Sequence, residues 1–152
     1  MTNLGHVVFY VRDLEQSLRF YTEAVGLSLS GKIFQDRAAL LSGGSTHHEL
    51  LLIQIGEADG PLHGKRIGPY PVGWKVGESL DELKARYSKL SQLGYAIDGL
   101  SNHTISQSIY LRDPDGNEVE LHVDDPGHDW KNDHSWMEAP VKPLRLDGRH
   151  GA

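Results

Sequence analysis

The sequence predicts an α+β fold built from two tandem βαβββ modules, because the same order of elements occurs twice. In the first module, a β-branched and aromatic run precedes a segment with helical apolar spacing and three further strand-like runs; these cover residues 6–11, 14–25, 27–34, 38–41 and 49–55. The second module repeats the order over residues 72–76, 80–93, 95–100, 106–111 and 118–123. One helix cannot cover four strands, so we expect the modules to share one curved, mixed sheet around a concave cavity, with the helices outside.

Both predicted helices carry start and stop signals. Each begins with a residue that favours the N-cap, followed three residues later by Gln or Glu, which is the spacing of a capping box. Each ends at a glycine, the residue that most easily adopts the left-handed conformation of a helix stop. The pairs are Asp13 with Gln16 and Ser79 with Glu82, and the glycines are Gly26 and Gly94.

The length and composition of the chain indicate one domain followed by a C-terminal arm. We assign residues 1–124 to one domain, with module one over about 4–56, module two over about 70–124, and residues 125–152 as a C-terminal arm. The arm shows no helical or strand period, but Trp130, Trp136 and Met137 are costly to leave in water. We therefore expect the arm to pack on the domain, on a dimer partner or at the cavity mouth.

Charge and residue content exclude several classes of function. The formal net charge of −6 disfavours nucleic-acid binding, which requires a basic face. No apolar run has the length of a membrane span. The chain has no cysteine, so disulfides, thiolate metal sites and cysteine nucleophiles are excluded. No signal peptide is visible, and we expect a cytoplasmic protein.

Several segments occur together in the order found in one known protein family. They are Leu4-Gly5-His6-Val7, residues 12–21, His47-His48-Glu49-Leu50, Gly73-Trp74-Lys75-Val76 and residues 111–121, which include Asp113-Pro114-Asp115-Gly116-Asn117-Glu118-Val119-Glu120. Over about residues 4–124 the chain resembles the vicinal oxygen chelate superfamily, which includes glyoxalase I, extradiol dioxygenases, fosfomycin-modifying enzymes and bleomycin-binding proteins. The His47 segment and Ser108-Ile109-Tyr110-Leu111 favour the extradiol dioxygenase branch. The resemblance also implies a homodimer and a small-molecule substrate or ligand.

That branch implies a 2-His-1-carboxylate site for Fe(II), with positions left open for a chelating diol and dioxygen. By motif position, His6 matches the first ligand and Glu120 the carboxylate ligand. The third ligand is expected at the start of the fifth strand, where this chain has Pro71. The internal repeat agrees, since Val7 pairs with Val72 and His6 therefore pairs with Pro71. Proline has no side-chain donor, so the three-ligand pattern is incomplete.

Three interpretations follow from Pro71. In the first, His48 or Glu49 completes the metal site: the repeat pairs Glu49-Leu50 with Glu120-Leu121, whereas the dioxygenase resemblance makes His48 an acid–base residue. Adjacent strand residues face opposite ways, so only one of the two points straight into the cavity. In the second, the cavity binds an organic ligand without metal. In the third, the catalysis is metal-free.

The leading expectation is an extradiol dioxygenase-like protein that acts on a small, vicinally oxygenated or aromatic compound through Fe(II) or another divalent cation. The resemblance implies catalytic roles for His48, for Tyr110, whose hydroxyl can donate to the substrate, and for His103, in the loop before the strand of Tyr110. A metal-free, drug-sequestering protein of the bleomycin-resistance type is the alternative. A glyoxalase-type lyase or isomerase is the third expectation, because that site requires four ligands.

Overall fold

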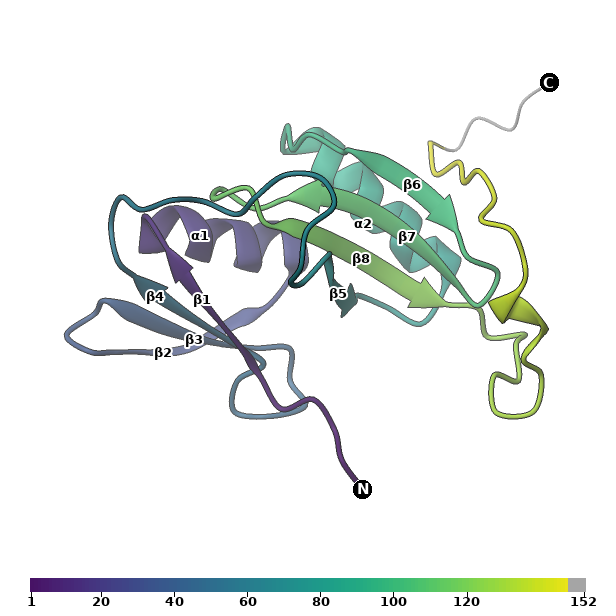
Figure 1. Cartoon of the computed structure of the whole chain (residues 1–152), viewed down its shortest axis with the longest axis horizontal. Helices are drawn as coiled ribbons and strands as arrows, with labels where there is room; N and C mark the ends of the chain where they lie inside the picture. The colour runs from purple at the N-terminus through teal and green to yellow at the C-terminus, as the bar shows by residue number, and fades with distance from the viewer. Residues whose placement is uncertain (148–152) are drawn as a thin grey trace. The chain divides into compact units, whose positions relative to one another are not determined.

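The computed structural model describes residues 1–147, which form two compact units. Unit 1 contains residues 1–67 together with 113–117, and unit 2 contains residues 68–112 together with the chain from 118 onward. Each unit holds one four-stranded sheet and one main helix, as the ribbon in Figure 1 shows.

Unit 1 is a βαβββ module. Its strands are β1 (Val7–Val11), β2 (Ser28–Ile33), β3 (Ala38–Ser42) and β4 (Leu50–Gln54), in the sheet order β1-β4-β3-β2. β1 runs parallel to β4, and the other pairs are antiparallel. Helix α1 (Leu14–Phe20) continues into a π-helical turn, η1 (Tyr21–Val25), and ends at Gly26, whose φ of 94° is left-handed.

Helix α1 covers only one face of this sheet. The backbone N–H of Leu14 donates to the Gln54 side chain over 2.8 Å, so the even-numbered side chains of β4 face the helix. Leu50 and Leu52, on that face, are fully buried, whereas Leu51 and Ile53, on the other face, are half-buried. We call the side of the sheet away from α1 the open face of unit 1.

Unit 2 repeats the same topology. Its strands are β5 (Val72–Lys75), β6 (Gly99–Asn102), β7 (Ser106–Arg112) and β8 (Glu118–Asp124), in the order β5-β8-β7-β6, with β5 parallel to β8. Helix α2 (Leu80–Gln92) packs on β7 and β8. The buried residues between helix and sheet include Leu83, Leu90, Ile109, Leu111, Val119, Leu121 and Val123. The alternate side chains of β7 and β8 lie on the side away from α2, which we call the open face of unit 2.

The two predicted modules and both helix starts are confirmed. Asp13 accepts a hydrogen bond from the backbone N–H of Gln16 over 2.9 Å. Ser79 accepts from the N–H of Glu82 over 3.3 Å, and the Glu82 carboxylate turns back to the helix start. The spacing of these residues is a local signal, so the sequence predicts the helix starts well.

Two details of the prediction are wrong. The strands form two four-stranded sheets and not one continuous sheet, because each first strand pairs with the last strand of its own module. The strand predicted at residues 95–100 begins only at Gly99 and extends to Asn102. The N–H of Tyr95 still donates to the Leu90 carbonyl at the end of α2, so the chain must leave the helix before it can join the sheet.

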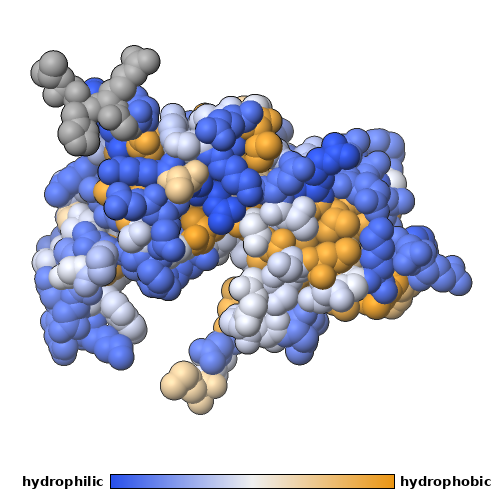
Figure 2. All heavy atoms as spheres, turned by 180° about the vertical axis from the view of Figure 1, so that it is seen from behind, coloured by the Kyte–Doolittle hydropathy of each residue, from blue (hydrophilic) through white to orange (hydrophobic). Residues whose placement is uncertain are grey.

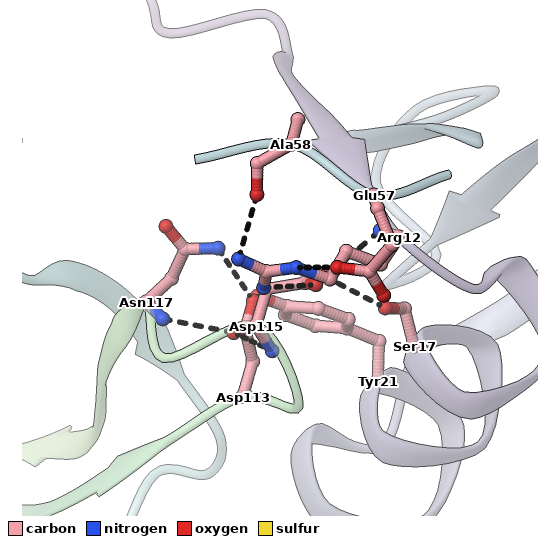
Figure 3. A network of polar contacts seen from close by, with 8 residues as sticks. All are labelled: Arg12, Ser17, Tyr21, Glu57, Ala58, Asp113, Asp115 and Asn117. Atoms are coloured by element: carbon pink, nitrogen blue, oxygen red, sulfur yellow. Dashed lines mark hydrogen bonds and ion pairs between the residues drawn. The ribbon is translucent and has the colours of Figure 1, made fainter. Parts of the chain in front are cut away.

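The turn between β7 and β8 is anchored within unit 1 by a network of side chains (Figure 3). The buried Asp113 carboxylate accepts from the Tyr21 hydroxyl over 2.8 Å and from the backbone N–H of Asn117 over 2.9 Å. Asp115 accepts from the Arg12 guanidinium over 3.0 Å. The Asp-Pro-Asp-Gly-Asn segment therefore has a structural role in holding this turn against α1 and η1.

The C-terminal arm packs on unit 2 along part of its length. Lys142 forms an antiparallel bridge with Asn102 at the end of β6, and Leu146 is buried. Trp136 lies half-buried within the short 3-10 turn η2 (Ser135–Met137), whereas Trp130 stays largely exposed. Residues 148–152 of the predicted arm lie outside the described residues. Among residues 1–147, no helix has both the length and the apolar character that crossing a membrane requires.

Candidate functional site

Glu120 lies near the middle of β8, on the open face of unit 2. Its neighbours across the sheet are Gly73 on β5 and Tyr110 on β7. Because Val119 and Leu121 point toward α2 and are buried, Glu120 points away from the core and is half-buried. The alternation of this strand thus places a carboxylate among polar neighbours at the centre of an uncovered sheet face.

One oxygen of Glu120 is held by two hydroxyl groups. Oε1 accepts a hydrogen bond from Ser108 Oγ over 2.6 Å and a longer one from the Tyr110 hydroxyl over 3.3 Å. The Tyr110 hydroxyl also lies 2.6 Å from His103 Nε2. Burial raises the pKa of Tyr110, and the negative charge of Glu120 raises it further, so the phenol keeps its proton and acts as a donor.

The other oxygen of Glu120, Oε2, makes no hydrogen bond with any residue in the described part of the chain. It lies over Gly73, where a Cβ atom would come within 3.6 Å of it. His122 follows two positions along β8 and faces the same way, with Nε2 3.8 Å from that same Cβ position. Unit 2 therefore presents a carboxylate oxygen that is oriented but available, beside an imidazole.

The histidines of unit 1 form a second cluster. The ring centroids of His6 and His48 are 4.8 Å apart, and those of His47 and His48 are 4.5 Å apart. The pKa of His48 is lowered, first by burial and then by the positive charge that His47 and His6 would carry. His48 is therefore a neutral imidazole at pH 7, which suits a proton acceptor.

The carboxylate of Glu49 is engaged in the turn between β3 and β4. It accepts from the backbone N–H of Gly43 over 2.7 Å and from Ser45 Oγ over 2.5 Å. Burial alone would raise the pKa of Glu49, but these hydrogen bonds outweigh burial and lower it. Of the two neighbours that the sequence left as alternatives, His48 is the one whose ring lies against His6.

The registers of the two sheets correct the predicted pairing of Glu49 with Glu120. Val7 lies opposite Leu50 and Val72 lies opposite Val119, which confirms that β1 matches β5. In the same registers, Leu51 holds the place of Glu120. Glu49, two residues before Leu51, therefore corresponds to Glu118. The predicted pairing of the fourth strands is wrong because the turns before β4 and β8 differ in length.

Pro71 precedes β5 and borders a pocket of about 300 Å³ in unit 2. Tyr70, Gly99, Tyr110, Arg112 and Glu118 also line this pocket. Tyr110 thus belongs both to the hydrogen-bonded chain that ends on Glu120 and to the pocket wall. A small molecule in this pocket would meet a phenol, a proline ring and charged groups at its edge.

The structure brings together Tyr110, His103 and Glu120 in unit 2, and His6 with His48 in unit 1. Within residues 1–147, no three His, Asp or Glu side chains already converge in the geometry of a metal site. Ser108 and His122 are not among the site residues that the sequence predicts. The period-two pattern of β8, in which Glu118, Glu120 and His122 share a face, was the signal that could have found His122.

The sequence model of the Glyoxalase/Bleomycin resistance protein/Dioxygenase superfamily matches residues 3–121. The chain is 31% identical over 132 residues to a catechol-2,3-dioxygenase of Bacillus subtilis (strain 168), which covers 87% of this chain and 45% of that protein. It is 32% identical over 127 residues to metallothiol transferase FosB of Lysinibacillus sphaericus (strain C3-41), which covers 80% of this chain and 82% of that protein. The chain thus spans less than half the length of the dioxygenase.

Solved structures show the same fold. A glyoxalase/dioxygenase from Nostoc punctiforme matches with a TM-score of 0.70 at 17% identity, over 81% of this chain and 91% of that one. A glyoxylase/bleomycin resistance protein/dioxygenase domain from Frankia sp. EAN1pec matches with a TM-score of 0.66 at 24% identity, over 84% and 96%. These likenesses concern the fold alone.

Proposed function

Because the chain belongs to the glyoxalase/bleomycin resistance protein/dioxygenase superfamily, we propose that it is a metal-dependent enzyme of the extradiol dioxygenase type. Its substrate is a small, vicinally oxygenated or aromatic compound. Fe(II), or another divalent cation, with Glu120 as a ligand, would chelate two adjacent substrate oxygens and stabilise the charge that develops on them.

The orientation of Glu120 carries this proposal. A carboxylate that binds a metal through one oxygen is typically fixed by hydrogen bonds to the other. Ser108 and Tyr110 supply such bonds to Oε1, and Oε2 stays available on the open face. A carboxylate with a merely structural role would have both oxygens engaged, as Asp113 does in the turn before β8.

The remaining side chains fit the handling of a proton and the orientation of a substrate. His48, which is neutral at pH 7, has the protonation state that a proton acceptor requires. Tyr110 borders the pocket beside Pro71, and its protonated phenol donates its one hydrogen bond to Glu120 Oε1. His103, through its contact with the Tyr110 oxygen, fixes the direction of that donation.

A metal-free ligand-binding protein is the second candidate, and Pro71 is the observation that favours it. Two aromatic side chains, Tyr70 and Tyr110, line the same pocket as Pro71, and a pocket of this kind holds a flat organic molecule without a metal. The glyoxalase-type reaction has less support, since Leu51 and not a carboxylate holds the place of Glu120 in unit 1.

Metal analysis tests the proposal. Protein purified without chelator is expected to contain a divalent metal, and Glu120→Ala is expected to lose it. Glu138→Ala removes an exposed carboxylate from the arm and serves as the matched control. With Fe(II) restored under anaerobic conditions, addition of oxygen and catechols should give ring-opened products in the wild type and in Glu138→Ala, and none in Glu120→Ala. Metal-free wild-type protein that binds catechols without opening them would establish the second candidate instead.

A further inference from the structure

Gly73 leaves an open space between two donor atoms on the open face of unit 2. A Cβ atom at this position would lie 3.6 Å from Glu120 Oε2, 3.6 Å from His122 Cδ2 and 3.8 Å from His122 Nε2. The carboxylate oxygen and the imidazole nitrogen therefore both border one small volume, which any residue other than glycine would fill. The backbone of Gly73 lies in a strand without a positive φ, so backbone strain gives no reason for glycine here.

The ring of His122 is oriented with one nitrogen turned away from this space. Nδ1 is buried and has no hydrogen-bond partner, and the nearest acid, Asp124 Oδ1, lies 3.7 Å away, beyond hydrogen-bond distance. Asp124 is itself paired with Lys75 over 3.3 Å. Nδ1 thus faces the side of Asp124, while Nε2 borders the space over Gly73.

Unit 1 provides an internal control for this arrangement. The registers β1–β4 and β5–β8 match Val8 to Gly73, so the space that is open in unit 2 is filled in unit 1. In the same registers, Leu51 and Ile53 stand in place of Glu120 and His122. Unit 1 forms the same sheet topology with apolar side chains at these places. Neither the open space nor the two donors of unit 2 is therefore needed to form the sheet.

We propose that Glu120 and His122 form a two-donor site over Gly73 for a divalent first-row metal, so that His122 supplies the ligand that Pro71 does not. This inference rests on the proposed function, because it takes Glu120 to be a metal ligand. The carboxylate and imidazole set suits Fe²⁺, Co²⁺ and Zn²⁺ and does not suit Ca²⁺ or Mg²⁺, which prefer oxygen ligands alone.

Co²⁺ titration of the full chain, dialysed free of metal, tests the site. His122→Ala is expected to lower the affinity at least about tenfold, and His134→Ala, which removes an exposed imidazole from the same unit, is expected to leave it unchanged. Gly73→Val keeps both donors but fills the space, and it should lower the affinity to a similar extent. Circular dichroism and thermal melting establish that each variant is folded, with His122→Gln as a second choice if the alanine variant is not.

A spectroscopic measurement separates ligation from a structural effect. In the Co²⁺-loaded protein, the proton on Nδ1 of a metal-bound imidazole gives a strongly shifted, exchangeable nuclear magnetic resonance signal. One such signal should disappear in His122→Ala. If Glu120→Ala loses Co²⁺ while His122→Ala keeps the wild-type affinity and signals, the two-donor site is wrong and the proposed function stands. If the wild-type chain binds no Co²⁺, both are wrong.

Discussion

The open faces of the two units differ in chemistry although their backbones share one register. In unit 1 the face is apolar, with Val8 46% and Tyr10 68% exposed, and seen from behind, the surface of this unit carries a patch of hydrophobic side chains (Figure 2). In unit 2 the matching positions are polar or small. The corresponding pairs, with unit 1 first, are Val8 and Gly73, Ala38 and Ser108, Leu40 and Tyr110, Leu51 and Glu120, and Ile53 and His122.

The fold and the site therefore have separate requirements. The faces toward α1 and α2 are apolar in both units, since they form the cores. The open faces are free to diverge: where unit 2 has the hydrogen-bonded Glu120, unit 1 has Leu51. The two turns before β4 and β8 diverge in the same way: each is held by a carboxylate, but Asp113 is buried whereas Glu49 is partly exposed.

The largest expected effect comes from Pro71→His. This substitution places a histidine in unit 2 at the position that matches His6 of unit 1. An added imidazole ligand should raise the affinity for Co²⁺ on the order of 100-fold, because four ligands of a structural zinc site together contribute about 10–16 kcal/mol. Calorimetric titration measures the gain. The same substitution in a Glu120→Ala background should give little gain, and an equal gain there would show that Glu120 is not part of the site.

The next largest effect on metal affinity is expected from removing the hydroxyl groups that donate hydrogen bonds to Glu120. Ser108→Ala, which installs the residue that unit 1 has at Ala38, and Tyr110→Phe should each lower metal affinity by about 10–100-fold, because each removes a hydrogen bond that orients the ligand. Ser88→Ala on the exposed side of α2 is the control. Unchanged affinity in both variants would mean that Glu120 needs no orientation to bind a metal.

Tyr21→Phe tests the buried turn before β8. It leaves Asp113 short of one donor and should destabilise the fold by about 1–3 kcal/mol. Burial, and then the charge of Asp113, raises the pKa of Tyr21 well above its ordinary value of 10.0. The folded state thus holds this proton more tightly, so the stability it adds is complete below about pH 10 and is lost as pH rises through the folded pKa. Urea unfolding from pH 8 to 11 should show this alkaline loss in the wild type and less of it in the variant.

The smallest effect is expected at the exposed turn before β4. Glu49→Gln should cost about 1 kcal/mol at pH 7, since solvent screens the two hydrogen bonds of the carboxylate. The pKa of Glu49 is lowered on folding, so this contribution is present above its ordinary pKa and is lost as pH falls through the folded value. Metal affinity should not change. A loss of affinity would instead support Glu49 as a metal ligand, which is one of the two alternatives that the sequence leaves open.

The sequence predicted the features that depend on local spacing. Both helix starts and both helix stops follow from residues within one turn of each other, and Gly94, with φ of 81°, is as expected. The direction of the His48 side chain was not predictable. His48 precedes β4, so the alternation of side chains along a strand does not apply to it. The match of Leu51 to Glu120 depends on the pairing of distant strands, which a comparison of sequence positions does not contain.

The bridge between Asn102 and Lys142 has a consequence for how this protein avoids aggregation. β6 lies at the edge of the sheet of unit 2, and edge strands offer unpaired backbone groups to other chains. At the end of β6, the N–H of each bridge residue donates to the carbonyl of the other, over 2.9 and 2.8 Å. The arm therefore occupies the place that an intruding strand would take, and a chain cut before Lys142 would present that end of the edge for self-association.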